Sequence, residues 1–235
     1  VLKQKYKNWE LIFWDNFSTD NSKQIIKKLK DKRIKYFFSG KFNTLYKSRN
    51  LAIKKAKGKY ISFLDVDDKW SKDKLSLQVK KLEKCKGNFI YSNYFIENIS
   101  TKKIYKRILS KLPEGKITQE LLNDYFLGIL TVLVKRDIFK KFQFNTKYNI
   151  IGDFDFFITL SQKYDFLCIQ KPLSTFKLHY DNYSTKNLNE YYEEVKKWLQ
   201  INNFKINKKF DLKNMKLMLF KLKLKKNFKL LKDFF

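Results

Sequence analysis

Short apolar runs alternate with amphipathic stretches over the first two-thirds of the chain. Continuous apolar runs predict buried strands, and apolar residues recurring at intervals of three or four predict helices. The pattern predicts strands at residues 11–14, 34–38, 60–64 and 89–91, and helices from about residue 22, at 45–57 and at 72–84. Strands that alternate with helices are typical of an α/β fold with a mainly parallel sheet.

Two of these helices have a predicted apolar face. The first, which Asp20 and Ser22 can cap, carries its apolar face on Ile25, Ile26 and Leu29. The second is expected to turn Leu51, Ala52 and Ala56 inward, and Gly58 lies just past its end.

The rest of the chain is less regular. The pattern predicts helices at 121–127 and from residue 153, and strands at 131–134, 166–169 and 175–178. From Leu188 onward it is helical, and residues 201–235 hold 11 Lys against 2 Asp. Residues 220–224 alternate like a strand, which leaves both assignments open there.

The Lys-rich tail has two interpretations. Its apolar residues suit an interfacial element on anionic lipid. They equally suit a helix that packs on the rest of the domain with a solvated lysine face. The apolar residues concerned are Met215, Met218, Leu219, Leu222, Phe228, Leu231 and Phe235.

Acidic residues follow two of the predicted strands. Asp15 ends the first strand, and Asp65, Asp67 and Asp68 follow the third. In parallel sheets ligands sit beyond the carboxyl ends of the strands, so these residues are expected at one rim. Carboxylates this close repel one another, and a divalent cation with phosphate oxygens would offset the repulsion. The alternative is a solvated turn that caps the next helix.

Composition excludes several classes of protein. Of the 235 residues, 43% are hydrophobic, which allows a sizeable core. Two Cys, at 85 and 168, and one His make neither a disulfide framework nor a structural zinc site. No apolar run reaches the roughly 18 residues of a membrane span, and the N-terminus does not resemble a signal peptide. We therefore expect a soluble, cytoplasmic protein.

The formal net charge of +29 has two explanations. One is an anionic partner, either nucleic acid or an acidic membrane surface. The other is compositional bias, because Lys, Asn, Ile, Phe and Tyr share AT-rich codons. Arg, which nucleic-acid readers use for bidentate contacts, is scarce, so nucleic acid is the less favoured partner. We favour bias, with attraction to the inner face of the cell membrane as a by-product.

Four landmarks occur in the order of a known family. They are Asn8–Ile12 with Asp15–Asp20, Arg49–Ile53 with Ala56–Trp70, Gly152–Asp155, and His179. Together they resemble the nucleotide-sugar-binding core of family 2 glycosyltransferases of the GT-A type. The resemblance covers most of the chain but not the family's opening strand, because residues 1–8 look like the exit of the first helix. An N-terminally truncated chain, with an exposed sheet edge there, is expected.

The resemblance implies a fold and an activity. The fold is a Rossmann-like, mostly parallel central sheet flanked by helices, in a glycosyltransferase domain at 1–185, followed by a helical basic extension at 186–235. The activity is an inverting transfer of a sugar from a nucleoside diphosphate, UDP in the first instance, to a glycan or lipid-linked acceptor in cell-surface polysaccharide synthesis. It implies a divalent metal, Mn²⁺ or Mg²⁺. The alternatives are a non-catalytic basic module that binds anionic membrane or nucleic acid, and an inactive truncated transferase.

The resemblance also assigns roles on the donor side. Asp15 would contact the nucleotide, and Asp65 and Asp67 would form the D-x-D pair that faces the nucleotide sugar. The metal ligands would come from Asp67, Asp68 and His179. Arg49 would approach the diphosphate or, as readily, pair with the acidic cluster.

On the acceptor side, the resemblance makes Asp153 the general base that takes the proton of the acceptor hydroxyl. Its alternative role is to cap the helix that it opens, and that position would lower its pKa. The family commonly has Glu where this chain has Gly152. Trp70 and Tyr183 are candidates for the wall of the acceptor site, although Trp70 equally suits a core anchor.

Overall fold

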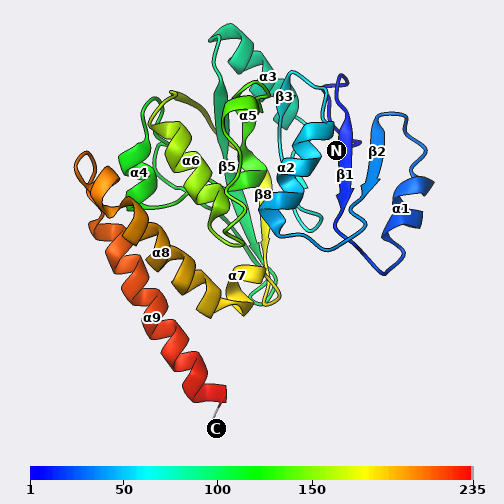
Figure 1. Cartoon of the computed structure of the whole chain (residues 1–235). Coiled ribbons are helices and arrows are strands. Elements are labelled where there is room, and N and C mark those ends of the chain that lie inside the picture. Colours follow the sequence, from blue (N-terminus) through cyan, green and yellow to red (C-terminus); the bar gives the residue numbers. More distant parts are fainter. Residues whose placement is uncertain (234–235) are drawn as a thin grey trace.

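The computed structural model describes the backbone of residues 1–233 and their side chains except those of 204, 205, 207 and 228–233. The expected tail residues Phe228, Leu231 and Phe235 therefore lie outside the side chains described. Figure 1 shows a sheet flanked by helices, a small parallel pair of strands beside it, and two long helices at the C-terminal end.

The strands and helices follow the order of the α/β pattern. The strands are β1 (Leu11–Asp15), β2 (Ile34–Phe38), β3 (Tyr60–Ile61), β4 (Lys69–Trp70), β5 (Phe89–Asn98), β6 (Lys103–Lys106), β7 (Leu133–Lys135) and β8 (Phe166–Leu178). The helices are α1 (Ser22–Lys28), α2 (Leu45–Lys55), α3 (Lys74–Lys84), α4 (Thr118–Asn123), the 3₁₀ turn η1 (Ile129–Thr131), α5 (Ile138–Lys141), α6 (Gly152–Ser161), α7 (Tyr183–Lys186), α8 (Leu188–Asn207) and α9 (Lys213–Asp233).

The α/β class is confirmed, but the larger sheet is mixed where a mainly parallel one was expected. Its strand order is β3-β7-β5-β8-β4, with β6 paired to β5. Within the described residues, β5 and β8 run parallel and the other pairings of this sheet are antiparallel. For β6 the reason is that it follows β5 through a short turn, and strands joined in this way pair antiparallel. The strands β1 and β2 form a separate parallel pair.

The sequence pattern divided β8 into two strands, and the structure joins them. The break in the pattern is at Pro172, which lacks a backbone N–H. The register between β5 and β8 shifts on either side of Asn93, which is the partner of Pro172. A bulge of this kind absorbs the missing donor and lets the strand continue.

Other predicted boundaries moved. The strand expected at 60–64 is hydrogen-bonded only at Tyr60–Ile61, and the helix expected at 121–127 lies at Thr118–Asn123. The expected apolar face of α1 is not buried, since Ile25 and Leu29 are both exposed. In α2 the fully buried side chains are Tyr46, Ser48 and Arg49, while Leu51, Ala52 and Ala56 are only partly buried. Residues 220–224 are helical and belong to α9.

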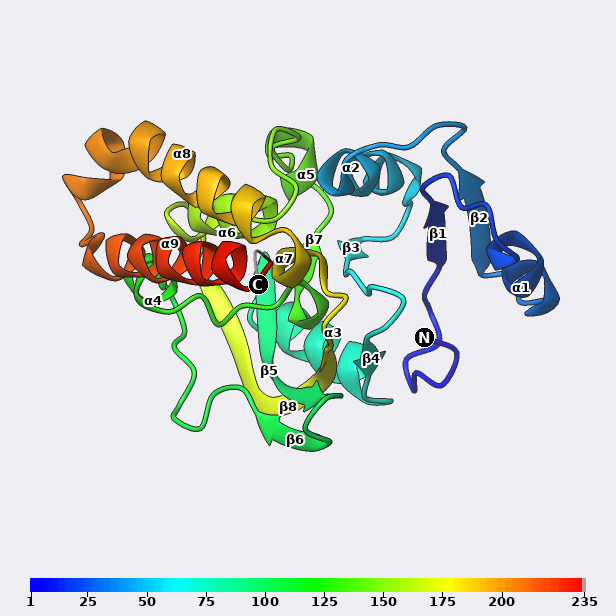
Figure 2. The ribbon, with the colours of Figure 1, turned by 90° about the horizontal axis from the view of Figure 1, so that it is seen from below.

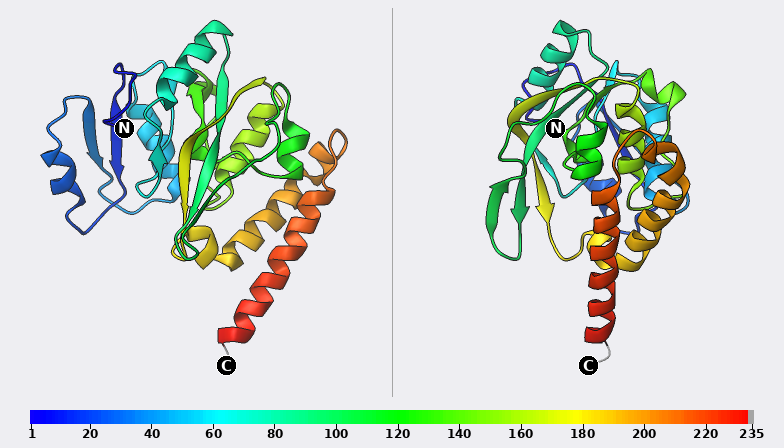
Figure 3. Two further views of the ribbon diagram at one scale, coloured as in Figure 1. Left: turned by 180° about the vertical axis from the view of Figure 1, so that it is seen from behind. Right: turned by 90° about the vertical axis from the view of Figure 1, so that its left-hand side faces the viewer.

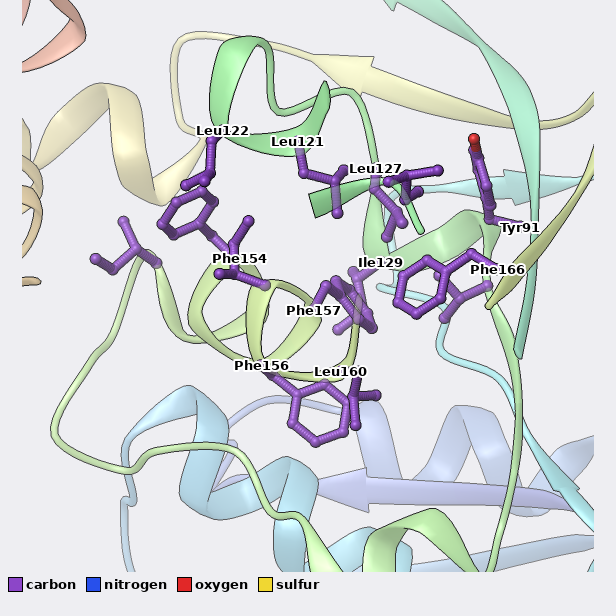
Figure 4. Close-up of a cluster of buried hydrophobic side chains, with 14 of the residues drawn as sticks. Tyr91, Leu121, Leu122, Leu127, Ile129, Phe154, Phe156, Phe157, Leu160 and Phe166 are labelled. Atoms are coloured by element: carbon purple, nitrogen blue, oxygen red, sulfur yellow. The ribbon is translucent and has the colours of Figure 1, made fainter. Parts of the chain in front are cut away.

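The core is aromatic and surrounds α6. Figure 4 shows Phe157 of α6 pointing toward Phe166, with Leu121 and Leu122 of α4 on the other side. Phe89 of β5 stacks on Phe166 of β8 with ring centroids 3.7 Å apart. This packing fixes α6, and with it the acidic residue at its start, against the sheet.

The helices α8 and α9 pack into the same core. Trp198 of α8 is 1% exposed, and Met215 and Leu222 of α9 belong to the same cluster as Phe154 of α6. Figures 2 and 3 show α8 and α9 side by side along one flank of the body. Within the described residues, no helix has the length and apolar character needed to cross a bilayer.

Candidate active site

The sequence-predicted residues lie on five segments of the chain. Asp15 is the last residue of β1, and Arg49 lies on α2. The acidic turn precedes β4, and Asp153 lies in the first turn of α6. His179 directly follows β8.

A chain of contacts joins Asp153 to the acidic turn. The Tyr46 hydroxyl donates a hydrogen bond to the Asp153 carboxylate at 2.9 Å. The Arg49 guanidinium lies 5.3 Å from the centre of the Tyr46 ring and donates to both carboxylate oxygens of Asp65, at 2.9 and 3.0 Å. Asp65 and Asp153, 88 positions apart in sequence, therefore share one buried cation between them.

This cation remains charged although it is buried. Burial acts to lower the pKa of Arg49, but Asp65, Tyr46 and Asp153 together raise it above its usual value. Of the two roles expected for Arg49, the structure shows the pairing with the acidic turn. The guanidinium still lies at the edge of the site, because Asp65 itself is 47% exposed.

The Asp153 carboxyl has a raised pKa, which corrects the expectation that the helix N-terminus would lower it. Burial raises the pKa, while Arg49, the Tyr46 hydroxyl and the Phe154 N–H lower it by a smaller amount. Desolvation outweighs the helix end because the side chain lies among aromatic rings from α2, α6 and α8. A carboxylate in this state accepts a proton more readily than an exposed one.

The three carboxylates of the acidic turn have different surroundings. Asp67 contacts His179, with Oδ2 3.0 Å from Nε2. Asp68 is buried and accepts a hydrogen bond from the Lys177 N–H at 3.1 Å. Burial, with the charges of Asp65 and Asp67, raises the pKa of Asp68 to about 7. The turn is thus held against β8 by Asp68 and leaves Asp65 and Asp67 toward solvent.

These contacts bear on the expected metal site. Among the described residues, no group of three or more His, Cys, Asp or Glu side chains is placed to hold a metal ion. Asp67 and His179 form a pair, and Asp68 faces the backbone of β8 instead. Mg²⁺ and Mn²⁺ in nucleotide sites are commonly held by one or two protein ligands, with phosphate and water oxygens as the rest. The Asp67–His179 pair fits a cation of that kind. Among the described residues, protein side chains alone do not complete a ligand shell there.

Asp15 lies at the end of β1 with both carboxylate oxygens engaged. Oδ1 accepts from the Ser18 N–H at 2.7 Å, and Oδ2 accepts from the Tyr36 hydroxyl. Burial raises the pKa of Asp15, but these hydrogen-bond donors lower it by a larger amount, so the net pKa is below the usual value. Next to it, Asn16 accepts a bond from Ser48, the residue before Arg49. This contact connects the end of β1 to the buried face of α2.

The two acceptor-side candidates lie in different surroundings. The Trp70 indole donates to the Leu130 carbonyl at 2.9 Å and packs against the cluster that contains Leu75 and Val79. These are the contacts of a core anchor. Tyr183 is 54% exposed on α7, and its hydroxyl donates to Glu190 of α8 at 2.9 Å. It lies four residues after His179 in sequence.

A cavity of about 250 Å³ opens beside Asp153. Its walls come from the segments around α4, α6, α8 and α9, and its lining is mostly apolar. The lining residues are Asp124, Tyr125, Ile150, Ile151, Asp153, Phe154, Tyr191, Val195, Met215 and Met218. The candidate base therefore faces a hollow that the C-terminal helices help to close.

Sequence reasoning did not find Tyr46, which contacts both Asp153 and Arg49. A signal was available, because Tyr46 and Arg49 are three residues apart on a helix and so share a face. The cavity residues Tyr125 and Tyr191 carried no such signal. They approach Asp153 only through the packing of α4 and α8 around α6.

The chain is similar to several known proteins. The family model described as "Glycosyl transferase family 2" matches residues 1–163. The chain is 35% identical over 144 residues to a UDP-Glc:alpha-D-GlcNAc-diphosphoundecaprenol beta-1,3-glucosyltransferase, WfgD, of Escherichia coli, covering 61% of this chain and 55% of that protein. It is 32% identical over 139 residues to the putative teichuronic acid biosynthesis glycosyltransferase TuaG of Bacillus subtilis, covering 58% and 54%. The chain thus spans about half the length of these relatives.

The fold is also found among solved structures. The crystal structure of S. aureus TarS 1–349 in complex with UDP-GlcNAc superposes with a TM-score of 0.65 at 16% identity, covering 82% of this chain and 58% of that one. At this identity the likeness concerns the fold, which is the expected GT-A type. From the extent of the family match, together with the fold and the order of the acidic landmarks, the chain belongs to glycosyl transferase family 2.

Proposed function

We propose that the chain transfers a sugar, with inversion, from a nucleoside diphosphate donor to a lipid-linked glycan acceptor in the synthesis of a surface polysaccharide. The observation that carries this is the contact chain from Asp153 through Tyr46 and Arg49 to Asp65. In this chain Asp153, which we propose as the proton acceptor, and the acidic turn, which we propose faces the diphosphate, lie on either side of the Arg49 guanidinium. The name of the WfgD relative, a UDP-glucose-dependent enzyme with a diphosphoundecaprenol acceptor, supports UDP as the nucleotide.

On the donor side, Asp15 would accept hydrogen bonds from the uracil or ribose, and Asp65 and Asp67 would face the sugar diphosphate. When the donor binds, its phosphates compete with Asp65 for the Arg49 guanidinium. A cation fixed at this point stabilises negative charge on the leaving diphosphate. Arg49 would then pair with Asp65 when the site is empty and with the diphosphate when the donor is bound.

On the acceptor side, Asp153 would take the proton of the attacking hydroxyl. The acceptor oxygen forms a bond to the anomeric carbon as the bond from that carbon to the diphosphate oxygen breaks. The proton moves to the Asp153 carboxylate, and the electron pair leaves with the nucleoside diphosphate. The raised pKa of Asp153 makes it a stronger base than an exposed aspartate, so one carboxylate is sufficient for the proton transfer.

Asp67 and His179 would hold a divalent cation, Mn²⁺ or Mg²⁺, with Asp68 supporting the turn from behind. Bound there, the cation would neutralise charge on the diphosphate. The protein's part is to hold the two ligands 3.0 Å apart and to keep the turn against β8 through Asp68. We retain Tyr183 as a rim contact for the acceptor, and Trp70 as the residue that fixes the position of β4 beneath it.

The apolar cavity beside Asp153 would receive part of the acceptor. Its methionines come from α9, and Tyr191 and Val195 come from α8, so the C-terminal extension would complete the acceptor site. A lipid-linked acceptor lies in a membrane, and the chain would meet it as a peripheral protein at the inner face.

Isothermal titration of the 235-residue chain with UDP-sugars, with and without Mn²⁺, tests the proposal. Wild type should bind the donor in a metal-linked manner. Asp67→Ala should lose that linkage. Asp153→Asn should keep donor binding and lose turnover, measured as UDP released in the presence of a GlcNAc-diphospholipid acceptor.

The control is Asp137→Ala, which removes an exposed carboxylate of the Asp137–Lys140 ion pair outside the site. It should leave both binding and turnover unchanged. Salt-sensitive binding of any polyanion, with no response to Asp67 or Asp153 substitution, would instead show a basic module without catalysis.

A further inference from the structure

The helix α9 has two apolar faces, of which one is covered. Met215 and Leu222 are buried in the core cluster, and Met218 and Leu219 pack partly against it. Leu217, Phe220 and Leu224 lie on the opposite side of the helix and are 47%, 57% and 42% exposed. They are spaced by three and four residues, so they form one continuous stripe. We call Leu217, Phe220 and Leu224 the outer stripe.

Lysines flank the outer stripe on both sides. At 3.6 residues per turn, Lys216 and Lys223 fall on one flank, and Lys221 and Lys225 fall on the other. All four side chains are exposed. Over the whole helix, residues 213–233 include eight Lys and one Asp. An apolar stripe between two rows of lysine is the pattern of a helix that lies in a lipid interface, with the ammonium groups at the headgroups.

The surrounding structure leaves this face accessible. Figures 1 and 3 show α9 projecting past α7, with α8 along only one of its sides. His179 lies between the end of β8 and α7 in the chain. The inward side of α9 is fixed at Lys226, which approaches Glu193 of α8 at 3.9 Å and lies 5.0 Å from the Tyr192 ring centre. The outer stripe is therefore held outward by packing on the inner side.

We propose that the outer stripe and its flanking lysines dock on an anionic phospholipid surface. Charge complementarity favours that occupant. A second copy of the chain would bring two sets of lysine rows together, at a net charge of +29 on each chain. Nucleic acid would pair with the lysines and leave the Leu and Phe side chains in the stripe without an apolar partner. Anionic lipid satisfies both parts of the pattern.

This inference extends the proposed function, since docking through α9 brings the end of the molecule with His179 and α7 toward a membrane-held acceptor. Its test needs neither donor nor acceptor, so its failure and that of the proposed function can be told apart. The full chain is sedimented with vesicles of equal parts phosphatidylglycerol and phosphatidylcholine, or of phosphatidylcholine alone, at physiological ionic strength. Wild type should bind only the first.

The apolar variant is Leu217→Ser/Phe220→Ser/Leu224→Ser. We expect its affinity for the anionic vesicles to fall roughly tenfold or more. The matched control is Ile25→Ser/Ile104→Ser/Leu109→Ser, which removes three exposed apolar side chains from α1, β6 and a loop. This control should bind as wild type does, and circular dichroism checks that both variants stay folded.

The charge variant is Lys216→Gln/Lys221→Gln/Lys223→Gln/Lys225→Gln, with an expected loss of roughly 100-fold or more. Its control is Lys28→Gln/Lys54→Gln/Lys80→Gln/Lys84→Gln, which lowers the net charge equally on α1, α2 and α3 and should cost far less. Equal losses in both lysine sets would overturn the proposal, because bulk charge would then explain binding. The proposal would also be overturned if the apolar variant bound the anionic vesicles as tightly as wild type. A wild-type dimer in solution that the apolar variant converts to monomer, without change in vesicle binding, would overturn it too.

Discussion

The ring of Tyr46 occupies the space in which a side chain on residue 152 would begin. A Cβ added to Gly152 would lie 2.4 Å from Cδ2 of Tyr46. The hydroxyl group of the same Tyr46 donates hydrogen bonds to the carboxylate of Asp153, the residue after Gly152, and to the Ile150 carbonyl, both at 2.9 Å. The position where the family commonly has Glu is thus glycine here, and a tyrosine from α2 contacts the neighbouring carboxylate.

Gly152→Ala should therefore lower both stability and activity. The ring of Tyr46 is 1% exposed and cannot move aside freely, so we expect a loss of about 1–3 kcal/mol in the free energy of unfolding. Displacing the ring also breaks the bond to Asp153, and turnover should fall more than tenfold. Thermal unfolding and UDP release measure the two effects. Gly58→Ala is the comparison, because its Cβ would meet the Tyr60 carbonyl oxygen at 3.3 Å, a milder contact, so its cost should be clearly smaller. A fully stable and active Gly152→Ala chain would contradict the packing described.

Tyr46→Phe should move the acid limb of the pH profile to higher pH. The Tyr46 hydroxyl lowers the pKa of Asp153, so its removal raises that pKa and leaves less of the base ionised at neutral pH. We expect kcat/KM at pH 7 to fall about tenfold and to recover partly in more alkaline buffer. Tyr180→Phe, on an exposed ring, is the control. A uniform loss at every pH would indicate a structural role for the hydroxyl instead.

Asp153→Asn should stabilise the chain at neutral pH while stopping turnover. Burial raises the pKa of Asp153 in the folded chain above its unfolded value. The folded state then binds the proton more tightly, and stability falls as the pH rises from the ordinary aspartate pKa through the raised one. Asparagine does not ionise, so Asp153→Asn removes this loss of stability. The Tm of the variant at pH 8 should therefore be about 2–4 °C above that of wild type, with a smaller difference at pH 4. If Asp153 served chiefly as a helix cap, the substitution would lower Tm at pH 8.

Trp198→Phe should show that α8 is integral to the catalytic core. The Trp198 Nε1–H donates to Asp155 of α6 at 2.9 Å, and the loss of that donor leaves a partly buried carboxylate short of a partner. We expect a cost of about 1–3 kcal/mol in the free energy of unfolding. Trp14→Phe is a matched control, because its buried Nε1–H has no hydrogen-bond partner among the described residues. Equal effects of the two substitutions would contradict a specific role for the bond to Asp155.

Much of the secondary structure was predictable because it depends on near neighbours in sequence. The strands at β1 and β2 and the helices α2, α3 and α6 follow from apolar spacing, with ends shifted by a few residues at most. The pairing of the sheet was not, since β4 and β7 gain their hydrogen bonds only from partners far along the chain. Alternation of residues cannot tell a return strand from a parallel one.

The sequence by itself determined which residues are candidates for the chemistry. It placed Asp15, the acidic turn, Asp153 and His179 at the ends of elements, in the order of a known family. It did so because an element's end is a local property of the chain.

Only the tertiary structure decided how those residues behave. It packed Tyr46 against Gly152 and set Arg49 between Asp65 and Asp153. It raised the pKa of a carboxylate that a helix end alone would have lowered, and it turned one apolar face of α9 inward and the other outward. The physical reason is that desolvation and Coulomb interaction depend on distance in space, and distant segments meet only when the chain has folded.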